Sequence, residues 1–221
     1  MASGDLASLP KHSSLRYTEN GQMQQLGLGL WINRPKAQFV RHVLDEGRCA
    51  AAILAVLRGN TGRIIFGVRL RYVDDQLLEV EAHVVPQNFQ FFNPEGIIPD
   101  GPDPWVEPVP ATMRQPREGL NQLLANYFDS AAQPSLLPPH AASCRRRQDG
   151  VLMAQQGSCG VPPGSQPFTE KRYPVVDETN GIATAIVVYE RYLGMYLFKV
   201  SGGVIQNIDI VGGALSQGSG W

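Results

Sequence analysis

The most regular hydrophobic pattern in the chain lies between residues 172 and 211. The apolar, β-branched runs 182–189 and 195–200 follow a polar turn at 179–181, and a Ser-Gly-Gly turn leads into a third apolar run, 204–211. Short apolar runs separated by turn residues are typical of antiparallel strands joined as a meander. This part of the sequence therefore predicts a β-sheet.

A weaker copy of the pattern comes earlier. Asn20-Gly21 is a strong hairpin signal. The expected strands of this earlier part are 16–19, 22–26, 49–58, 64–72 and 77–85. Cys49, beside an Ala-rich strand, is expected in the core, whereas the pattern of residues 40–46 is ambiguous.

The clearest helix is expected at 116–130, with Pro116 in its first turn. Its apolar residues recur at spacings of three and four, which gives one apolar stripe: Leu120, Leu123, Leu124, Tyr127 and Phe128. A dense run of prolines before it, from residue 86 onward, excludes long regular structure there.

The proline-rich stretch therefore suggests a division of the chain. We expect a first unit at 1–86, a linker at 87–115 held to the surface by its aromatic side chains, and a second unit at 116–221. With strands in both units and a helix in the second, the expected fold class is α+β.

Composition excludes several classes of protein. The apolar fraction of 43% is enough for a core, and a net charge of −1 without a long basic run argues against a nucleic-acid surface. No apolar run is long enough for a membrane span, and residues 1–10 lack a signal-peptide pattern, so a cytoplasmic location is expected.

Three cysteines are too few for a disulfide scaffold, and they lack the spacing of a metal site. Cys144 and Cys159 flank an expected hairpin and could pair, or could be buried as ordinary small apolar residues. No zinc motif, phosphate loop or nucleophile elbow is present, so neither a metal nor a cofactor is expected.

The two units also resemble each other. Glu19-Asn20-Gly21 matches Gln148-Asp149-Gly150, and Leu77, Val80 and Glu81 match Ile205, Ile208 and Asp209. The shared offset of roughly 128 residues indicates an internal duplication. The counterpart of the helix at 116–130 would fall before residue 1, so the first unit is expected to lack its leading helix. We expect the linker, the other unit or a partner chain to cover the apolar face this leaves.

Several motifs resemble those of a known superfamily. They are R-Y-T-E-N-G at 16–21, G-L-G-L-W at 27–31, E-P-V-P at 107–110, Y-F-D at 127–129, R-Y-P-V-V-D-E at 172–178 and S-G-W at 219–221. Together with the helix and the Cys-x-Arg hairpin, they resemble tandem members of the nuclear-transport-factor-2-like superfamily, which includes polyketide-cyclase-like and scytalone-dehydratase-like proteins. Such relatives can be secreted.

The resemblance implies two cone-like units in tandem, each a curved antiparallel sheet packed on helices, with a pocket at its open end. Such cones host dehydratases, isomerases and cyclases, and also binding or dimerisation modules, so the fold does not settle the function. A homodimer is compatible with this family. The sequence departs from the pattern at Gln148-Asp149-Gly150 and at Tyr189-Glu190-Arg191.

In the second unit, proton-transfer chemistry would need an acid and a base that face one pocket. The candidate catalytic residues are Asp177, His140, Tyr189 and Arg146, and the candidate substrate contacts are Tyr173 and Lys199. Asp177 follows two valines, where burial could raise its pKa, but it could equally cap the Asn180-Gly181 turn. His140 follows two prolines in an expected loop, where a histidine more often lies at the surface.

In the first unit, the candidate substrate contacts are Tyr17, Glu19 and Trp31. Two strands of this unit also carry charged residues on one face: Arg69, Arg71, Glu79, Glu81 and His83. These five side chains could line a cone, or could form cross-strand ion pairs on a solvated sheet face.

The resulting hypothesis is a cofactor-independent lyase or isomerase that acts on a small, apolar, oxygenated metabolite. Asp177 and His140 would be the acid and base, and Arg146 or Tyr189 would stabilise an oxyanion. The rival hypothesis is a non-catalytic small-molecule-binding or dimerisation module, which the altered residues of the second unit favour.

Overall fold

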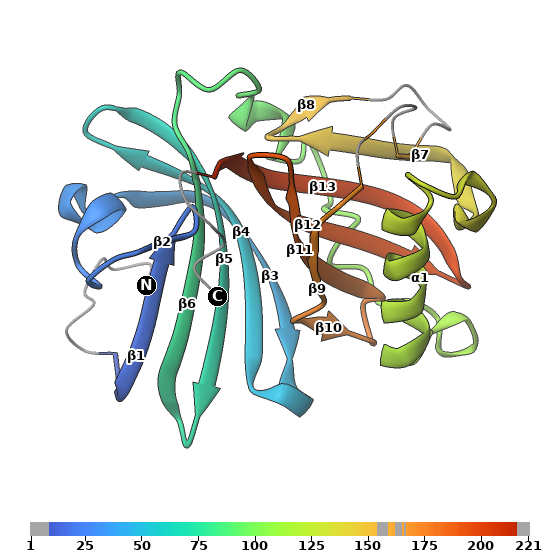
Figure 1. Ribbon diagram of the computed structural model, residues 1–221, viewed down its shortest axis with the longest axis horizontal. Coiled ribbons are helices and arrows are strands. Elements are labelled where there is room, and N and C mark those ends of the chain that lie inside the picture. The colour runs from blue at the N-terminus through green and yellow to red at the C-terminus, as the bar shows by residue number, and fades with distance from the viewer. Residues whose placement is uncertain (1–8, 154–158, 162–164, 166, 216–221) are drawn as a thin grey trace.

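The computed structural model describes residues 9–153, 159–161, 165 and 167–215. They form two curved β-sheets and one α-helix, which is an α+β fold (Figure 1). The S-G-W motif at 219–221 lies outside the described residues. No helix among those described is long and apolar enough to cross a membrane.

The first sheet is built from the N-terminal part of the chain, with its strands in the order β2-β1-β6-β5-β4-β3. Its strands are β1 (Lys11–Glu19), β2 (Gln22–Met23), β3 (Lys36–Asp45), β4 (Ala50–Gly59), β5 (Gly62–Val73) and β6 (Gln76–Val85). Two short 3-10 helices, η1 (Gly29–Asn33) and η2 (Glu46–Arg48), flank β3. The ambiguous segment 40–46 is thus mostly strand. Cys49 is exposed, so its expected core position is wrong.

The second sheet has the order β10-β11-β12-β13-β7-β8, and β9 also pairs with β11. Its strands are β7 (His140–Gln148), β8 (Val151–Leu152), β9 (Glu170–Arg172), β10 (Val176–Asp177), β11 (Ile182–Tyr189), β12 (Tyr192–Ser201) and β13 (Val204–Ala214). The helix α1 (Arg117–Asp129) precedes it, close to the expected bounds of 116–130.

The two sheets share one unusual feature of topology. In each, the first strand of the hairpin lies parallel to the last strand of the sheet: β1 beside β6, with Tyr17 opposite Val80, and β7 beside β13, with Arg146 opposite Ile208. The sheets are therefore mixed rather than purely antiparallel. Both hairpins turn where the sequence predicts, at Asn20-Gly21 and Asp149-Gly150, with positive φ angles at all four residues.

One core cluster lies between the two sheets. Apolar side chains of the first sheet, such as Leu54 and Ile65, belong to the same buried cluster as Ile186, Met195 and Leu197 of the second. The opposite face of the second sheet is covered by α1, whose predicted apolar stripe is buried against β11 and β12. Figure 1 shows α1 on the side of the second sheet away from the first.

The opposite face of the first sheet is covered differently. Trp31 and Leu30 of η1 pack with Ala55 and Phe66 over part of it, and Trp31 meets Phe66 edge to face. Val40 on the edge strand β3 is 46% exposed. Among the described residues, this face of the first sheet is therefore covered in part by η1 of the same half, and not by the linker or the other half.

The proline-rich segment between the sheets contains only short 3-10 helices, η3 (Pro94–Gly96) and η4 (Ala111–Met113), and another, η5 (Pro134–Leu136), follows α1. It is not merely laid on the surface, because Trp105 is buried in the cluster between the sheets. The ammonium of Lys199 donates to the carbonyl oxygens of Glu107 and Asn180, both at 2.6 Å, which ties this segment to the second sheet.

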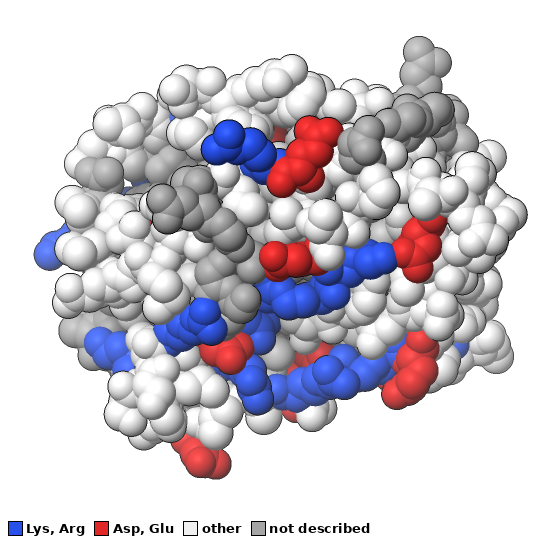
Figure 2. Space-filling model, in the orientation of Figure 1, with Lys and Arg blue, Asp and Glu red and all other residues white. Residues whose placement is uncertain are grey.

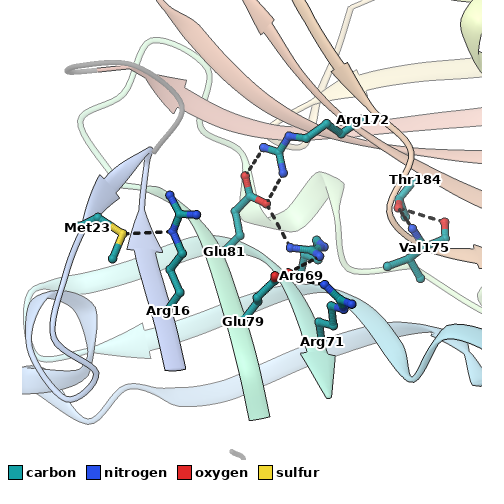
Figure 3. Close-up of polar contacts among 9 residues, drawn as sticks. All are labelled: Arg16, Met23, Arg69, Arg71, Glu79, Glu81, Arg172, Val175 and Thr184. Carbon is teal, nitrogen blue, oxygen red and sulfur yellow. Dashed lines mark hydrogen bonds and ion pairs between the residues drawn. The ribbon is translucent and has the colours of Figure 1, made fainter. Parts of the chain in front are cut away.

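Buried ion pairs join the two halves in a reciprocal way. Arg172 of β9 donates two hydrogen bonds to Glu81 of β6, which is fully buried (Figure 3). In the opposite direction, Arg41 of β3 donates to Asp209 of β13 at 2.7 Å. Each half thus sends an arginine from an outer strand to a buried carboxylate on the last strand of the other.

The charged residues of the first sheet belong to this junction. Arg69 lies 2.5 Å from Glu79 and 3.7 Å from Glu81, and Arg71 lies 3.3 Å from Glu79. Figure 2 shows basic and acidic side chains gathered in a band on this face of the molecule. The cross-strand ion pairs are present, but Glu81 and His83 are buried rather than solvated.

Candidate functional site

A hollow of about 470 Å³ lies on the α1 side of the second sheet. Its wall is formed by α1, β7, β12 and the turn between β11 and β12. The side chains that give it its character are Tyr127, Arg146, Gln148, Tyr189, Tyr192 and Tyr196. This volume is within the range of small-molecule sites, which run from about 300 to 1,000 Å³.

Local structure explains why these residues meet. Alternation along β7 turns Arg146 and Gln148 toward the α1 side, where Cys144 is also buried, whereas Arg145 and Arg147 line a different hollow. Tyr127 belongs to the apolar stripe of α1. Phe168 packs edge to face on Tyr196 and at a tilt on Tyr189, which gives the hollow an aromatic wall.

Three tyrosines of the hollow, Tyr127, Tyr192 and Tyr196, are neutral hydrogen-bond donors at ordinary pH. Burial raises the pKa of Tyr127 to about 12, against the opposing effect of Arg146 beside it. Burial also raises the pKa of Tyr192, helped by the negative charge of Asp149, and burial raises the pKa of Tyr196. These phenols can therefore donate to an acceptor, but they are poorly suited to act as bases.

Arg146 supplies positive charge to the hollow. Its Nε has no hydrogen-bond partner among the described residues, and its guanidinium is permanently charged. Arg191 and Glu190, both exposed, line the hollow at the turn between β11 and β12. A guanidinium with a free donor beside phenolic hydroxyls suits an anionic or strongly polarised oxygen.

Asp149 is a buried acid next to this wall. It follows Gln148 at the hairpin turn, and burial raises its pKa to about 8, although a hydrogen bond from the Gly212 amide acts in the other direction. Asp149 influences the pKa of Tyr192 and Tyr196 but does not line the hollow itself.

The four predicted catalytic residues do not converge. Arg146 and Tyr189 line the hollow, but Asp177 lies in another hollow with Asp45 and Arg117. The carboxylate of Asp177 accepts from the backbone N and the side chain of Asn180, at 2.9 and 2.7 Å, so it caps the turn. The predicted grouping of Asp177 with Arg146 and Tyr189 is therefore wrong.

His140 is also separated from this site. It begins β7 opposite Ile205, whereas Arg146 lies opposite Ile208, and the pairing of β7 with β13 shifts register between them. His140 is not among the residues that line the hollow. The structure therefore does not bring His140 into the hollow with Arg146, contrary to the prediction from the sequence.

The predicted substrate contacts are divided between several places. The hydroxyl of Tyr17 donates to the carboxylate of Glu19, which also accepts from the amide of Leu30 at 2.8 Å, and this fixes η1 on the first sheet. Trp31 lines a separate, apolar hollow of about 300 Å³. None of these three residues touches the hollow beside Arg146.

Tyr173 and Lys199 of the second half lie outside it as well. Tyr173 packs against the core under α1, and burial raises its pKa to about 12. Burial lowers the pKa of Lys199, whose ammonium is held by the carbonyl oxygens described above. Both residues therefore have structural contacts in place of the predicted substrate contacts.

Sequence reasoning missed three of the tyrosines. Tyr127 looked like part of a helical core stripe, Tyr196 looked like an ordinary strand residue, and Tyr192 lay between two expected strands. Spacing of four residues on one strand places Tyr192 and Tyr196 on the same face, which was the available signal. Among the described residues, no group of three or more His, Cys, Asp or Glu side chains is placed to hold a metal ion.

The comparisons with known proteins give one result. Residues 113–212 match the model of a family described as a domain of unknown function, DUF8021. This segment contains α1 and nearly all of the second sheet, and it includes Arg146 and the four tyrosines of the hollow. Neither the curated proteins nor the solved structures give a match.

Proposed function

We propose that the hollow of the second sheet binds a small, apolar, oxygenated molecule that carries an anionic group. The observation that carries this proposal is Arg146, whose Nε has no partner among the described residues and whose side chain lines an otherwise aromatic hollow. A guanidinium in such surroundings recognises carboxylate or enolate oxygens through charge-assisted hydrogen bonds.

The hydroxyl groups of Tyr127, Tyr192 and Tyr196 support the same ligand class. Their raised pKa values keep them protonated, so they can donate to the ligand's oxygens beside Arg146. Phe168 and the tyrosine rings offer an apolar surface for the body of the ligand.

Acid–base catalysis by a lyase or isomerase is the second candidate. Glu190 favours it, because this carboxylate lines the same hollow as Arg146 and Tyr189. Glu190 would remove a proton from a carbon next to a carbonyl, and Arg146 would stabilise the resulting oxyanion. Glu190 would take the role first assigned to Asp177 and His140, and no cofactor would take part.

The matching strand orders support a proposal for the architecture. The chain would consist of two cone-like units of the nuclear-transport-factor-2-like type, arising by duplication and packed through their sheets inside one molecule. The face of each sheet that packs against the other half is already buried, so a homodimer would use a different surface.

A disulfide between Cys144 and Cys159 bears on the compartment. Both cysteines are buried in the core under α1. Disulfides persist in oxidising compartments and are rare in the cytosol, so this bond favours a secreted or otherwise oxidising location over the cytoplasmic one.

A ligand screen tests the proposed binding. Aromatic and aliphatic carboxylates would be ranked by thermal shift, and dissociation constants would be measured for the strongest acid. Losing a charge-assisted hydrogen bond weakens binding by about 1.5–3 kcal/mol, so Arg146→Gln is expected to weaken it about 10- to 100-fold.

Arg145→Gln is the matched control, because Arg145 lies on the same strand and faces away from the hollow. It should leave the affinity unchanged. Equal losses in the two variants, or no binding of any acid by the parent protein, would refute the proposal. Proton exchange at the carbon next to the ligand's carbonyl, lost in Glu190→Gln, would establish the catalytic candidate.

A further inference from the structure

The two hairpin turns differ at one decisive position. In the first sheet, Asn20 makes paired hydrogen bonds with Val84: the Asn20 side-chain nitrogen donates to the Val84 carbonyl at 3.0 Å, and the Val84 amide donates to Oδ1 of Asn20 at 2.9 Å. The backbone N of Asn20 also donates to Ala82 at 2.8 Å. The amide side chain of Asn20 thus uses both its nitrogen as a donor and its oxygen as an acceptor.

Asp149 occupies the corresponding position in the second sheet. Its backbone N donates to Ile210 at 2.8 Å, and the Gly212 amide donates to its Oδ1 at 3.1 Å. Its other oxygen, Oδ2, is buried and has no hydrogen-bond partner among the described residues. Because the N–H and C=O of one strand residue point to the same side, the Gly212 carbonyl also faces this side chain.

An ionised Asp149 would bring a carboxylate oxygen toward that carbonyl oxygen. Both atoms are acceptors, and a buried charge without a partner is strongly unfavourable. A protonated Asp149 can donate from Oδ2 and reproduce the paired hydrogen bonds of Asn20. We propose that Asp149 is a neutral carboxylic acid in the native protein near neutral pH, and that loss of its proton controls the neighbouring hollow.

The surroundings of Asp149 agree with this proposal. Tyr192 and Tyr196 of β12 face it without offering a positive charge. On the other side, Asn93 donates to the carbonyl of Asp149 at 2.8 Å, and the acidic residue of η3, Glu95, is paired with Arg63. Burial raises the pKa of Asp149 to about 8, which is consistent with the missing partner.

Ionisation of Asp149 would affect the hollow through the residues that adjoin both. Gln148 precedes Asp149, and Tyr192 is influenced by its charge, and both residues line the hollow. A negative charge behind this wall opposes the binding of an anion, and loss of the hydrogen bond that protonated Oδ2 donates to the Gly212 carbonyl loosens the turn. This consequence rests on the proposed function, whereas the protonation of Asp149 does not.

Unfolding equilibria measured as a function of pH test the protonation state of Asp149 directly. Between pH 5 and 7 an unfolded aspartate is ionised and the native Asp149 is not. The unfolding constant of the parent protein should therefore rise about tenfold per pH unit relative to that of Asp149→Asn. The amide side chain of this variant would keep both hydrogen bonds and has no proton to lose in this range.

The reciprocal variant Asn20→Asp should gain the same dependence in the first sheet, and it tests the principle even if Asp149→Asn fails to fold. Parallel pH profiles for the parent, Asp149→Asn and Asn20→Asp would overturn the proposal. The second arm measures the binding of 8-anilinonaphthalene-1-sulfonate, an aromatic anion, at pH 6 and pH 9.

The parent protein should bind this probe up to about tenfold more weakly at pH 9 than at pH 6, and Asp149→Asn should bind equally at both values. Binding that is independent of pH in the parent would overturn control of the hollow. Absence of binding by the parent at pH 6 would instead count against the proposed function for aromatic anions, and the unfolding profiles would still decide the state of Asp149.

Discussion

Arg41→Met is expected to destabilise the protein strongly, because Arg41 holds the two halves and the linker together. The side chain is 3% exposed. Its guanidinium donates to both carboxylate oxygens of Asp103, at 2.9 and 3.0 Å, and to Asp209 at 2.7 Å. The guanidinium also lies 4.9 Å from the ring centre of Trp105. The substitution keeps most of the volume but leaves two carboxylates without this partner.

The size of the effect follows from burial. Removing one partner of a buried ion pair reduces the free energy of unfolding by about 3–5 kcal/mol. Two features moderate the loss: Arg147 lies 3.8 Å from Asp209, and burial already raises the pKa of Asp209, so this carboxyl can take up a proton. We therefore expect a loss of about 3 kcal/mol at pH 7, and a smaller loss in mild acid.

Urea unfolding followed by circular dichroism measures this loss. The slope with urea concentration should stay constant while the midpoint falls. Arg145→Met is the control, since Arg145 is exposed, and its effect should lie within about 0.5 kcal/mol. Adding Asp209→Asn to Arg41→Met should recover part of the loss. A loss below about 1 kcal/mol in Arg41→Met would refute the argument that this ion pair is a buried, structural contact.

Two further predictions concern groups buried in the core. Burial lowers the pKa of His83 to about 4, so its contribution to stability is complete above pH 6.5 and is lost as the pH falls toward 4. This amounts to about 3 kcal/mol, and His83→Leu should lose less stability than the parent in acid titrations; equal acid slopes would contradict this. Replacing Cys144 and Cys159 by alanine removes a cross-link between residues 15 apart, which should lower the free energy of unfolding by about 3 kcal/mol. Dithiothreitol should destabilise the parent in urea but not this variant, and an unaffected parent would argue against the bond.

Much of the fold could be predicted from the sequence, because its turns and its helix depend on residues close together in the chain. Asn20-Gly21 and Asp149-Gly150 adopt the positive φ angles that their types favour, and the apolar stripe of α1 is buried as its spacing indicates. The segment 40–46 could not be assigned because β3 has one buried and one partly exposed face only in the context of the other half. Trp105 is buried for the same reason.

The candidate site was harder to predict from the sequence, because it depends on which face of each strand packs against which neighbouring element. Arg146 and Tyr189 were identified, but Asp177 and His140 were joined to them on chemical type alone. Asp149 looked like a turn residue, and only its burial beside Gly212 gives it a chemical role. The pairing of Arg41 with Asp209 links residues far apart in sequence, so no local pattern reports it.

We propose that Arg146 selects an anionic ligand in the hollow of the second sheet. Calorimetric titration with 2-naphthoate and its methyl ester, against the parent protein and Arg146→Gln, tests it most directly. We expect the parent to bind the acid at least about tenfold more tightly than the ester, because only the acid forms a charge-assisted hydrogen bond. Arg146→Gln should bind the two equally. An unchanged preference for the acid in Arg146→Gln, or no preference in the parent, would contradict the account.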